Sequence, residues 1–179
     1  TVAAEVDPTP DYRGFEVLVY RLTEGLPDTL GLAITDSTGR FVMHIRASRP
    51  GIYPLRISRR GTVLATGSLV VAPGDSAQLR AVFPLQNRRL LVRSRENAAW
   101  LAYQNAIALH NQDLLRGLQA ELDSQATAQV LERTLTLLHS VETTYPGTLG
   151  AQWAAAEAVR LLAGWAPTQA LVRFDSLPP

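Results

Sequence analysis

The stretch ITDSTGRFVMHIRASRPGIYPLRIS, residues 34–58, decides how the first half of the chain is interpreted. Asp36 and Ser37 can cap their own turn through side-chain to backbone hydrogen bonds, and Gly39 can adopt a positive φ. The apolar residues that follow alternate with residues of the opposite face, as in a half-buried strand: Phe41, Met43 and Ile45. The stretch therefore predicts a corner between two strands rather than a reactive loop.

Outward from this corner, short runs rich in β-branched and aromatic residues continue in both directions. Seven such runs are candidate strands: 14–22, 30–35, 40–46, 51–58, 62–71, 76–83 and 88–94. Turns rich in Gly, Pro and Asx separate them. The pattern predicts an antiparallel β-sandwich of about seven strands over residues 14–94, preceded by an extended leader over residues 1–13.

From residue 95 onward the apolar residues follow the period of a helix instead of that of a strand. Helices are predicted from about residue 96 to 122, from 124 or 127 to 144, from 148 or 149 to 164, and from 168 to 177. Residues 95–179 are therefore expected to form a region of three to four helices that leads to a further C-terminal domain outside this chain. The predicted fold class is α+β, a β-sandwich followed by a helical region.

Composition argues against several classes of function. The formal net charge is +1, and no apolar run approaches the roughly 18 residues that a membrane-spanning helix needs. We therefore expect no nucleic-acid partner and no membrane span in this chain. Cysteine is absent, which excludes a disulfide, a thiolate metal site and thiol redox chemistry within these residues.

No catalytic or metal-binding set stands out from the sequence. The tetrapeptide at residues 36–39 differs from an aspartic-protease loop by one extra residue, and no second copy exists to form a carboxylate dyad. His44, His110 and His139 lie far apart without a Glu-x-x-His spacing, and there is no nucleophile elbow or glycine-rich phosphate loop. We expect no catalytic residue, no metal and no cofactor, and therefore no enzyme activity of this chain alone.

Arginines on the predicted strands form the charge cluster with a functional interpretation. They are Arg56, Arg59, Arg60, Arg88 and Arg89. If their strands pair, these side chains form a basic strip for an anionic partner. The alternative is that they are simply the solvated face of the sheet, and the sequence leaves both interpretations open.

Several motifs together resemble one known arrangement. Between residues 34 and 83 these are DSTGRF, PGIYPLRIS and VVAPGDSAQL, and they are followed by LLVRSRENAAWLAY at 90–103 and TYPGTLGAQWAAAEAVRLL at 144–162. In this order they resemble the N-terminal sandwich-plus-helical domain, a domain of unknown function, of Bacteroidetes thioredoxin-like thiol-disulfide oxidoreductases. The hairpin at DSTGRF and PGIYPL is also similar to transthyretin-like and carboxypeptidase-regulatory sandwiches.

The resemblance implies a non-catalytic N-terminal accessory module of an exported thiol-disulfide oxidoreductase, in the periplasm or cell envelope. Its partner would be the thioredoxin-like domain of the same polypeptide, which the helical region positions or dimerises as a homodimer. An export leader or membrane tether would lie outside this chain, as would the Cys-x-x-Cys motif. The alternative is a stand-alone surface module with a transthyretin-like sandwich that binds a peptide, a glycan or a polyanion.

Overall fold

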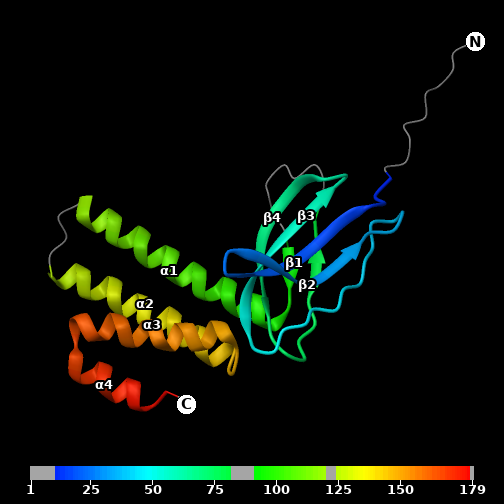
Figure 1. Cartoon of the computed structure of the whole chain (residues 1–179). Coiled ribbons are helices and arrows are strands. Elements are labelled where there is room, and N and C mark those ends of the chain that lie inside the picture. Colours follow the sequence, from blue (N-terminus) through cyan, green and yellow to red (C-terminus); the bar gives the residue numbers. More distant parts are fainter. Residues whose placement is uncertain (1–10, 82–90, 120–123, 178–179) are drawn as a thin grey trace, which may run out of the picture. The chain divides into compact units, whose positions relative to one another are not determined.

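The computed structural model describes residues 11–81, 91–119 and 124–177. It is an α+β protein with a four-stranded antiparallel sheet, a two-stranded sheet and four helices (Figure 1), as the sequence predicted at the level of fold class. The chain divides into two compact units. The sheet unit comprises Thr1–Pro73 and Arg80–Leu91, and the helical unit comprises Gly74–Leu79 and Val92–Pro179.

The four-stranded sheet consists of two hairpins, β1 (Phe15–Thr23) with β2 (Leu26–Ile34) and β3 (Gly51–Arg59) with β4 (Thr62–Val71). β1 and β3 pair antiparallel in the centre, which gives the order β2-β1-β3-β4 (Figure 1). In both tight turns the two loop residues have positive φ, as a two-residue type I′ turn requires. These loops are Glu24-Gly25 and Arg60-Gly61.

The two central strands supply the core of the sheet unit. Val17 and Val19 on β1 lie directly opposite Ile57 and Leu55 on β3. All of these side chains are at most 2% exposed. The alternating apolar residues that predicted the strands therefore form one buried face of the sheet.

The predicted corner at residues 36–39 is a turn. The Gly39 N–H donates to the Asp36 carbonyl at 3.0 Å, and Gly39 has a φ of 80°. Asp36 Oδ1 accepts from the Thr38 hydroxyl at 2.7 Å, the Thr38 N–H at 2.8 Å and the Arg40 N–H at 3.0 Å. These bonds, above all that from the Thr38 hydroxyl, hold the pKa of Asp36 below its ordinary value. The carboxylate is thus occupied by its own turn.

The predicted strand at residues 40–46 is not a strand in the structure. The segment runs beside β2, where the Arg46 N–H donates to the Leu30 carbonyl at 3.0 Å. The pairing of β1 with β2 shifts by one residue between Val19 and Tyr20, which leaves Leu30 outside the register. Because such a bulge interrupts the ladder and twists the strand locally, the segment meets β2 at this point instead of pairing along it.

The last two predicted strands are shorter than expected. β5 (Gln78–Arg80) and β6 (Leu91–Arg93) form the two-stranded sheet, while residues 82–90 lie outside the described part of the chain. Most of the predicted leader, residues 1–10, also lies outside it. The described ranges thus contain a four-stranded and a two-stranded sheet, and the seven-strand sandwich is not confirmed.

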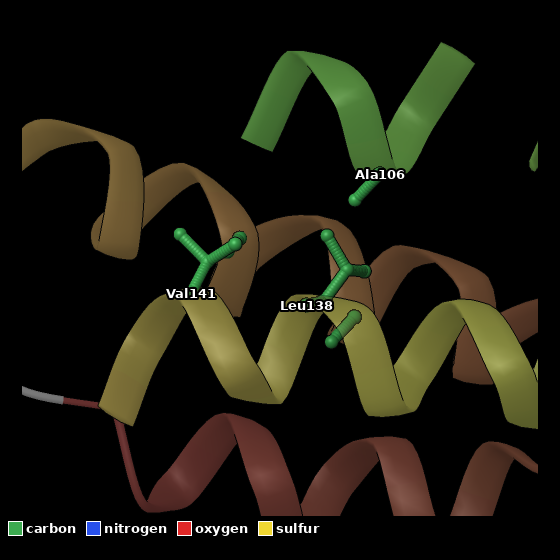
Figure 2. Packing of buried hydrophobic residues seen from close by; sticks show 5 residues of the cluster. Ala106, Leu138 and Val141 are labelled. Atoms are coloured by element: carbon green, nitrogen blue, oxygen red, sulfur yellow. The ribbon is translucent and has the colours of Figure 1, made fainter. Parts of the chain in front are cut away.

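The helical unit contains the predicted helices in the predicted order. They are α1 (Arg95–Gln119), α2 (Ser124–Thr144), α3 (Leu149–Trp165) and α4 (Pro167–Asp175). The first three pack on one another, and α4 packs against α3 (Figure 1). Leu138 and Val141 of α2 meet small residues of the neighbouring helices in the core (Figure 2), namely Ala106, Ala154 and Ala158.

The N-terminus of α3 is fixed by side chains from two elements. The Thr148 hydroxyl accepts from the Ala151 N–H at 3.2 Å and donates to the Tyr145 carbonyl at 2.7 Å. Glu96 of α1 accepts from the Leu149 N–H at 2.9 Å. Carboxylates and hydroxyls stabilise a helix N-terminus because they satisfy its free N–H groups. These contacts tie the start of α3 to the start of α1.

Candidate functional site

The structure places Arg56 and Arg59, two members of the predicted arginine strip, on opposite faces of the sheet. They are three residues apart on β3, and side chains alternate between the faces of a strand. The Arg59 guanidinium lies 4.8 Å from the centre of the Phe15 ring and donates to the Asp11 carbonyl at 3.0 Å. Arg59 therefore packs across β1 and does not extend the surface around Arg56.

Arg56 belongs to a polar group on the other face of the sheet, with Glu16 and Ser58. Glu16 and Ser58 are paired in register, and the Ser58 hydroxyl donates to Glu16 Oε1 at 3.3 Å. The Arg56 Nη2 lies 3.9 Å from the same oxygen. Sequence reasoning missed Glu16 and Ser58 because their proximity depends on the pairing of β1 with β3, which we did not predict.

Arg60 lies in the turn between β3 and β4, where its φ is 50°. It lines an open pocket of about 310 Å³ together with Arg56, Glu16 and Ser58. The structure thus brings Arg56 and Arg60 to one pocket and separates Arg59 from them. Arg88 and Arg89 lie outside the described residues, so their part in the strip stays a prediction.

A second candidate surface is the outward face of α4 in the helical unit. Its large apolar side chains are strongly exposed: Leu171 at 66%, Val172 at 70% and Phe174 at 61%. On its inner side Ala170 is buried, and Arg173 pairs with Glu142 of α2. The helix is thus held against its neighbours while three large apolar residues face outward.

Three aromatic side chains gather between α1 and α3. The Trp100 ring centre lies 5.3 Å from that of Tyr103 and 6.0 Å from that of Trp153, with Tyr103 and Trp153 6.2 Å apart. At these distances the rings pack on one another's faces and edges. Burial, together with the charge of Glu157, raises the pKa of Tyr103. The cluster therefore joins the two helices and leaves Trp153 about half exposed.

His110 is a buried histidine between α1 and α2. Its Nδ1 lies 2.9 Å from the hydroxyl oxygen of Thr134, and that hydroxyl donates to the Val130 carbonyl at 2.8 Å. Because the one hydroxyl proton of Thr134 is used on Val130, His110 Nδ1 must carry the proton of its bond to Thr134. Among the described residues no group of three or more side chains is arranged to hold a metal ion.

The helical unit is expected to lose stability in mild acid because of His110. Burial is the main cause that lowers the pKa of His110. The charges of Glu157 and Asp113 raise this pKa and the charge of Arg160 lowers it, all to a smaller extent. In the unfolded chain the pKa of a histidine is about 6.5, so the unfolded chain takes up a proton first as the pH falls. The free energy of unfolding should have its full value above about pH 6.5. It should fall as the pH drops from this unfolded-state pKa to the lower pKa of the folded state.

Urea unfolding followed by tryptophan fluorescence, from about pH 8 to about pH 5, measures this dependence. All three tryptophans lie in the helical unit, so the signal reports on that unit. His110→Gln keeps a donor for Thr134 and removes the titrating group. A pH dependence that is the same in His110→Gln and in the original chain would contradict the prediction.

Comparison with known proteins leaves the function to be argued from the residues. No protein-family model matches the sequence, and no curated protein matches it. Within the described ranges, none of the helices combines the length and the apolar character that crossing a bilayer requires. The two candidate surfaces come from the structure itself. They are the arginine pocket of the sheet unit and the apolar face of α4.

Proposed function

We propose that this chain is a non-catalytic N-terminal accessory module of an exported thiol-disulfide oxidoreductase of the periplasm or cell envelope. Its helical unit positions or dimerises a thioredoxin-like domain of the same polypeptide. The observation that carries the proposal is the apolar face of α4, defined by Leu171, Val172 and Phe174. In the chain order that the resemblance implies, α4 is the element next to the thioredoxin-like domain.

Two physical arguments support a docking role for this face. Burying apolar surface is favourable by about 25 cal/mol per Å², so exposed side chains of this size are a source of binding free energy. The geometry of the face is also fixed before a partner arrives, because Ala170 is packed and Arg173 is paired with Glu142. A preorganised apolar face of this kind suits a permanent partner in the same polypeptide.

The natural reading frame gives the first test. We expect an export leader before Thr1 and a Cys-x-x-Cys domain encoded after Pro179. A stop codon soon after Pro179 would overturn the redox part of the proposal. Thiol-disulfide turnover by these 179 residues alone would overturn its non-catalytic part.

A charge placed on the α4 face tests docking directly in the protein with its redox domain. The double variant Leu171→Glu and Phe174→Glu should release the redox domain or the second copy, because a carboxylate is costly to bury against an apolar partner. Sedimentation velocity and small-angle scattering would report a more extended or a smaller particle. Gln169→Glu, at an exposed polar position of the same helix, should leave the sedimentation coefficient and the scattering profile unchanged. An unchanged sedimentation coefficient and scattering profile in the double variant would contradict the proposal.

The stand-alone binding module is the second candidate function, and the arginine pocket is the observation that favours it. In both proposals residues 14–94 complete the transthyretin-like, seven-strand sandwich implied by the resemblance. Cross-strand nuclear Overhauser effects between residues 40–46, 82–90 and the four-stranded sheet would test that completion. Their absence would leave the four-stranded sheet as the whole of this layer.

A further inference from the structure

The pocket beside Arg56 is built on a row of side chains that crosses all four strands. Ile34 pairs with Glu16, Glu16 with Ser58, and Ser58 with Val63, and each of these residues lines the pocket. Its volume of about 310 Å³ lies at the lower end of the range of about 300–1,000 Å³ for small-molecule sites. A pocket of this volume has room for one small group.

The charges of the pocket do not balance. Arg56 and Arg60 contribute two guanidinium groups, and Glu16 contributes the carboxylate that faces Arg56 at 3.9 Å. This separation is longer than a charge-assisted hydrogen bond, which measures about 2.7–2.9 Å. In the described part of the chain Arg60 has no ion-pair partner. One positive charge is therefore available to a ligand.

One donor of Arg56 is also enclosed without an acceptor. Its Nε is shielded from solvent and has no hydrogen-bond partner among the described residues. An enclosed N–H without an acceptor costs free energy, which a turn of the Arg56 side chain toward an incoming oxygen atom recovers.

Aliphatic side chains stand beside these charges. Ile34 is 64% exposed and Val63 is 51% exposed, although both are on strands of a folded sheet. They lie at the two ends of the row that contains Glu16 and Ser58. A ligand that reaches the arginines can thus bury an aliphatic group against one of them.

We propose that this pocket binds a carboxylate that carries a small aliphatic group. Its oxygens accept from the guanidinium groups of Arg56 and Arg60, whose planar donors match the paired acceptors of a carboxylate. Its aliphatic group contacts Ile34 or Val63. Glu16 leaves a single net positive charge and repels a second negative one, so a monoanion is favoured over a phosphate dianion.

This chemistry is shared by a free branched carboxylic acid and by the C-terminal residue of a peptide. The inference stands apart from the proposed role of α4, because every residue that carries it belongs to the sheet unit. Loss of one proposal therefore leaves the other intact.

A ¹H–¹⁵N NMR titration of the whole chain tests the site with matched probes. N-acetyl-leucine should shift the amides of Gly14 and Gly61, which line the pocket, in a saturable manner. N-acetyl-leucinamide, which lacks only the carboxylate, should not. Equal responses to the two probes would overturn the proposal, as would tighter binding of inorganic phosphate at the same amides.

A tetrapeptide that ends in leucine identifies the source of the carboxylate. Tighter binding of this peptide than of N-acetyl-leucine supports a peptide C-terminus as the ligand, and weaker binding supports a free acid. Saturable binding of either probe supports the carboxylate site. Absence of saturable shifts with both probes would overturn it.

Substitutions separate a binding role of the arginines from a structural one. Arg56→Gln and Arg60→Gln should each weaken N-acetyl-leucine binding by about tenfold, the value of one charged hydrogen bond. Arg59→Gln, on the opposite face of the same strand, should leave the affinity within about twofold. Glu16→Gln removes the internal competitor for Arg56 and should tighten binding about threefold or more. Weaker binding in Glu16→Gln would overturn the proposal. This result does not depend on whether the arginine variants fold.

Discussion

Replacing Gly150 with alanine is expected to destabilise the helical unit by about 2 kcal/mol, although alanine is the better helix former. A Cβ at Gly150 would lie 2.5 Å from the carbonyl carbon of Ala99 and 2.7 Å from the Trp100 nitrogen. Both are backbone atoms of α1, so no side-chain rotation relieves the clash. The two helices must separate, and the contacts around Ala99, which is 0% exposed, are then lost.

Gly164→Ala on the same helix is the matched control. A Cβ at Gly164 meets nothing within 4 Å, so this variant should be unchanged or more stable by about 0.5 kcal/mol. Urea unfolding followed by tryptophan fluorescence compares the two, because all three tryptophans lie in the helical unit. Equal free energies of unfolding for Gly150→Ala and Gly164→Ala would show that α1 and α3 do not meet at Gly150.

Leu138→Ala should cost about 3 kcal/mol of the free energy of unfolding of the helical unit. Leu138 is 0% exposed and lies at the centre of the contact between α2 and the small residues of its neighbours (Figure 2). Alanines already line this contact, at positions 106, 154 and 158. Because alanine side chains cannot turn into the space, the part of the cavity that they line should remain.

Leu118→Ala gives the comparison for the same chemical change on an exposed site. Leu118 is 79% exposed on α1, and its substitution should change the stability by at most about 0.5 kcal/mol. Thermal unfolding by circular dichroism at 222 nm provides a second measurement beside urea. A loss at Leu138 no larger than that at Leu118 would contradict the assignment of Leu138 to the core.

The apolar periods in the sequence predicted the helices well and the sheet less completely. The ends of α2, α3 and α4 lie within about two residues of their predicted positions, because capping residues and Pro or Gly mark them locally. The segment at 40–46 has the alternation of a strand but does not form one. Whether this segment pairs along β2 as a strand depends on the bulge at Leu30. That bulge is a property of the pairing between β1 and β2.

The arginine strip shows the same limit at the level of a site. The sequence grouped Arg56, Arg59 and Arg60 because they are close along the chain. The register of β1 against β3 separated Arg59, which packs on Phe15, and added Glu16 and Ser58 to the group around Arg56. Strand alternation alone could have separated Arg56 from Arg59, but the partners on β1 required the strand order.

By itself the sequence determined the α+β class, the turn at Asp36, the positions of the helices and the absence of cysteine. These features depend on local backbone preferences and on the period of apolar residues, which neighbours along the chain specify. Only the tertiary structure decided the strand order β2-β1-β3-β4, the contact of Gly150 with Ala99 and the row from Ile34 to Val63. Such features join residues far apart in the chain, and their stability comes from packing and cross-strand pairing, which local sequence does not encode.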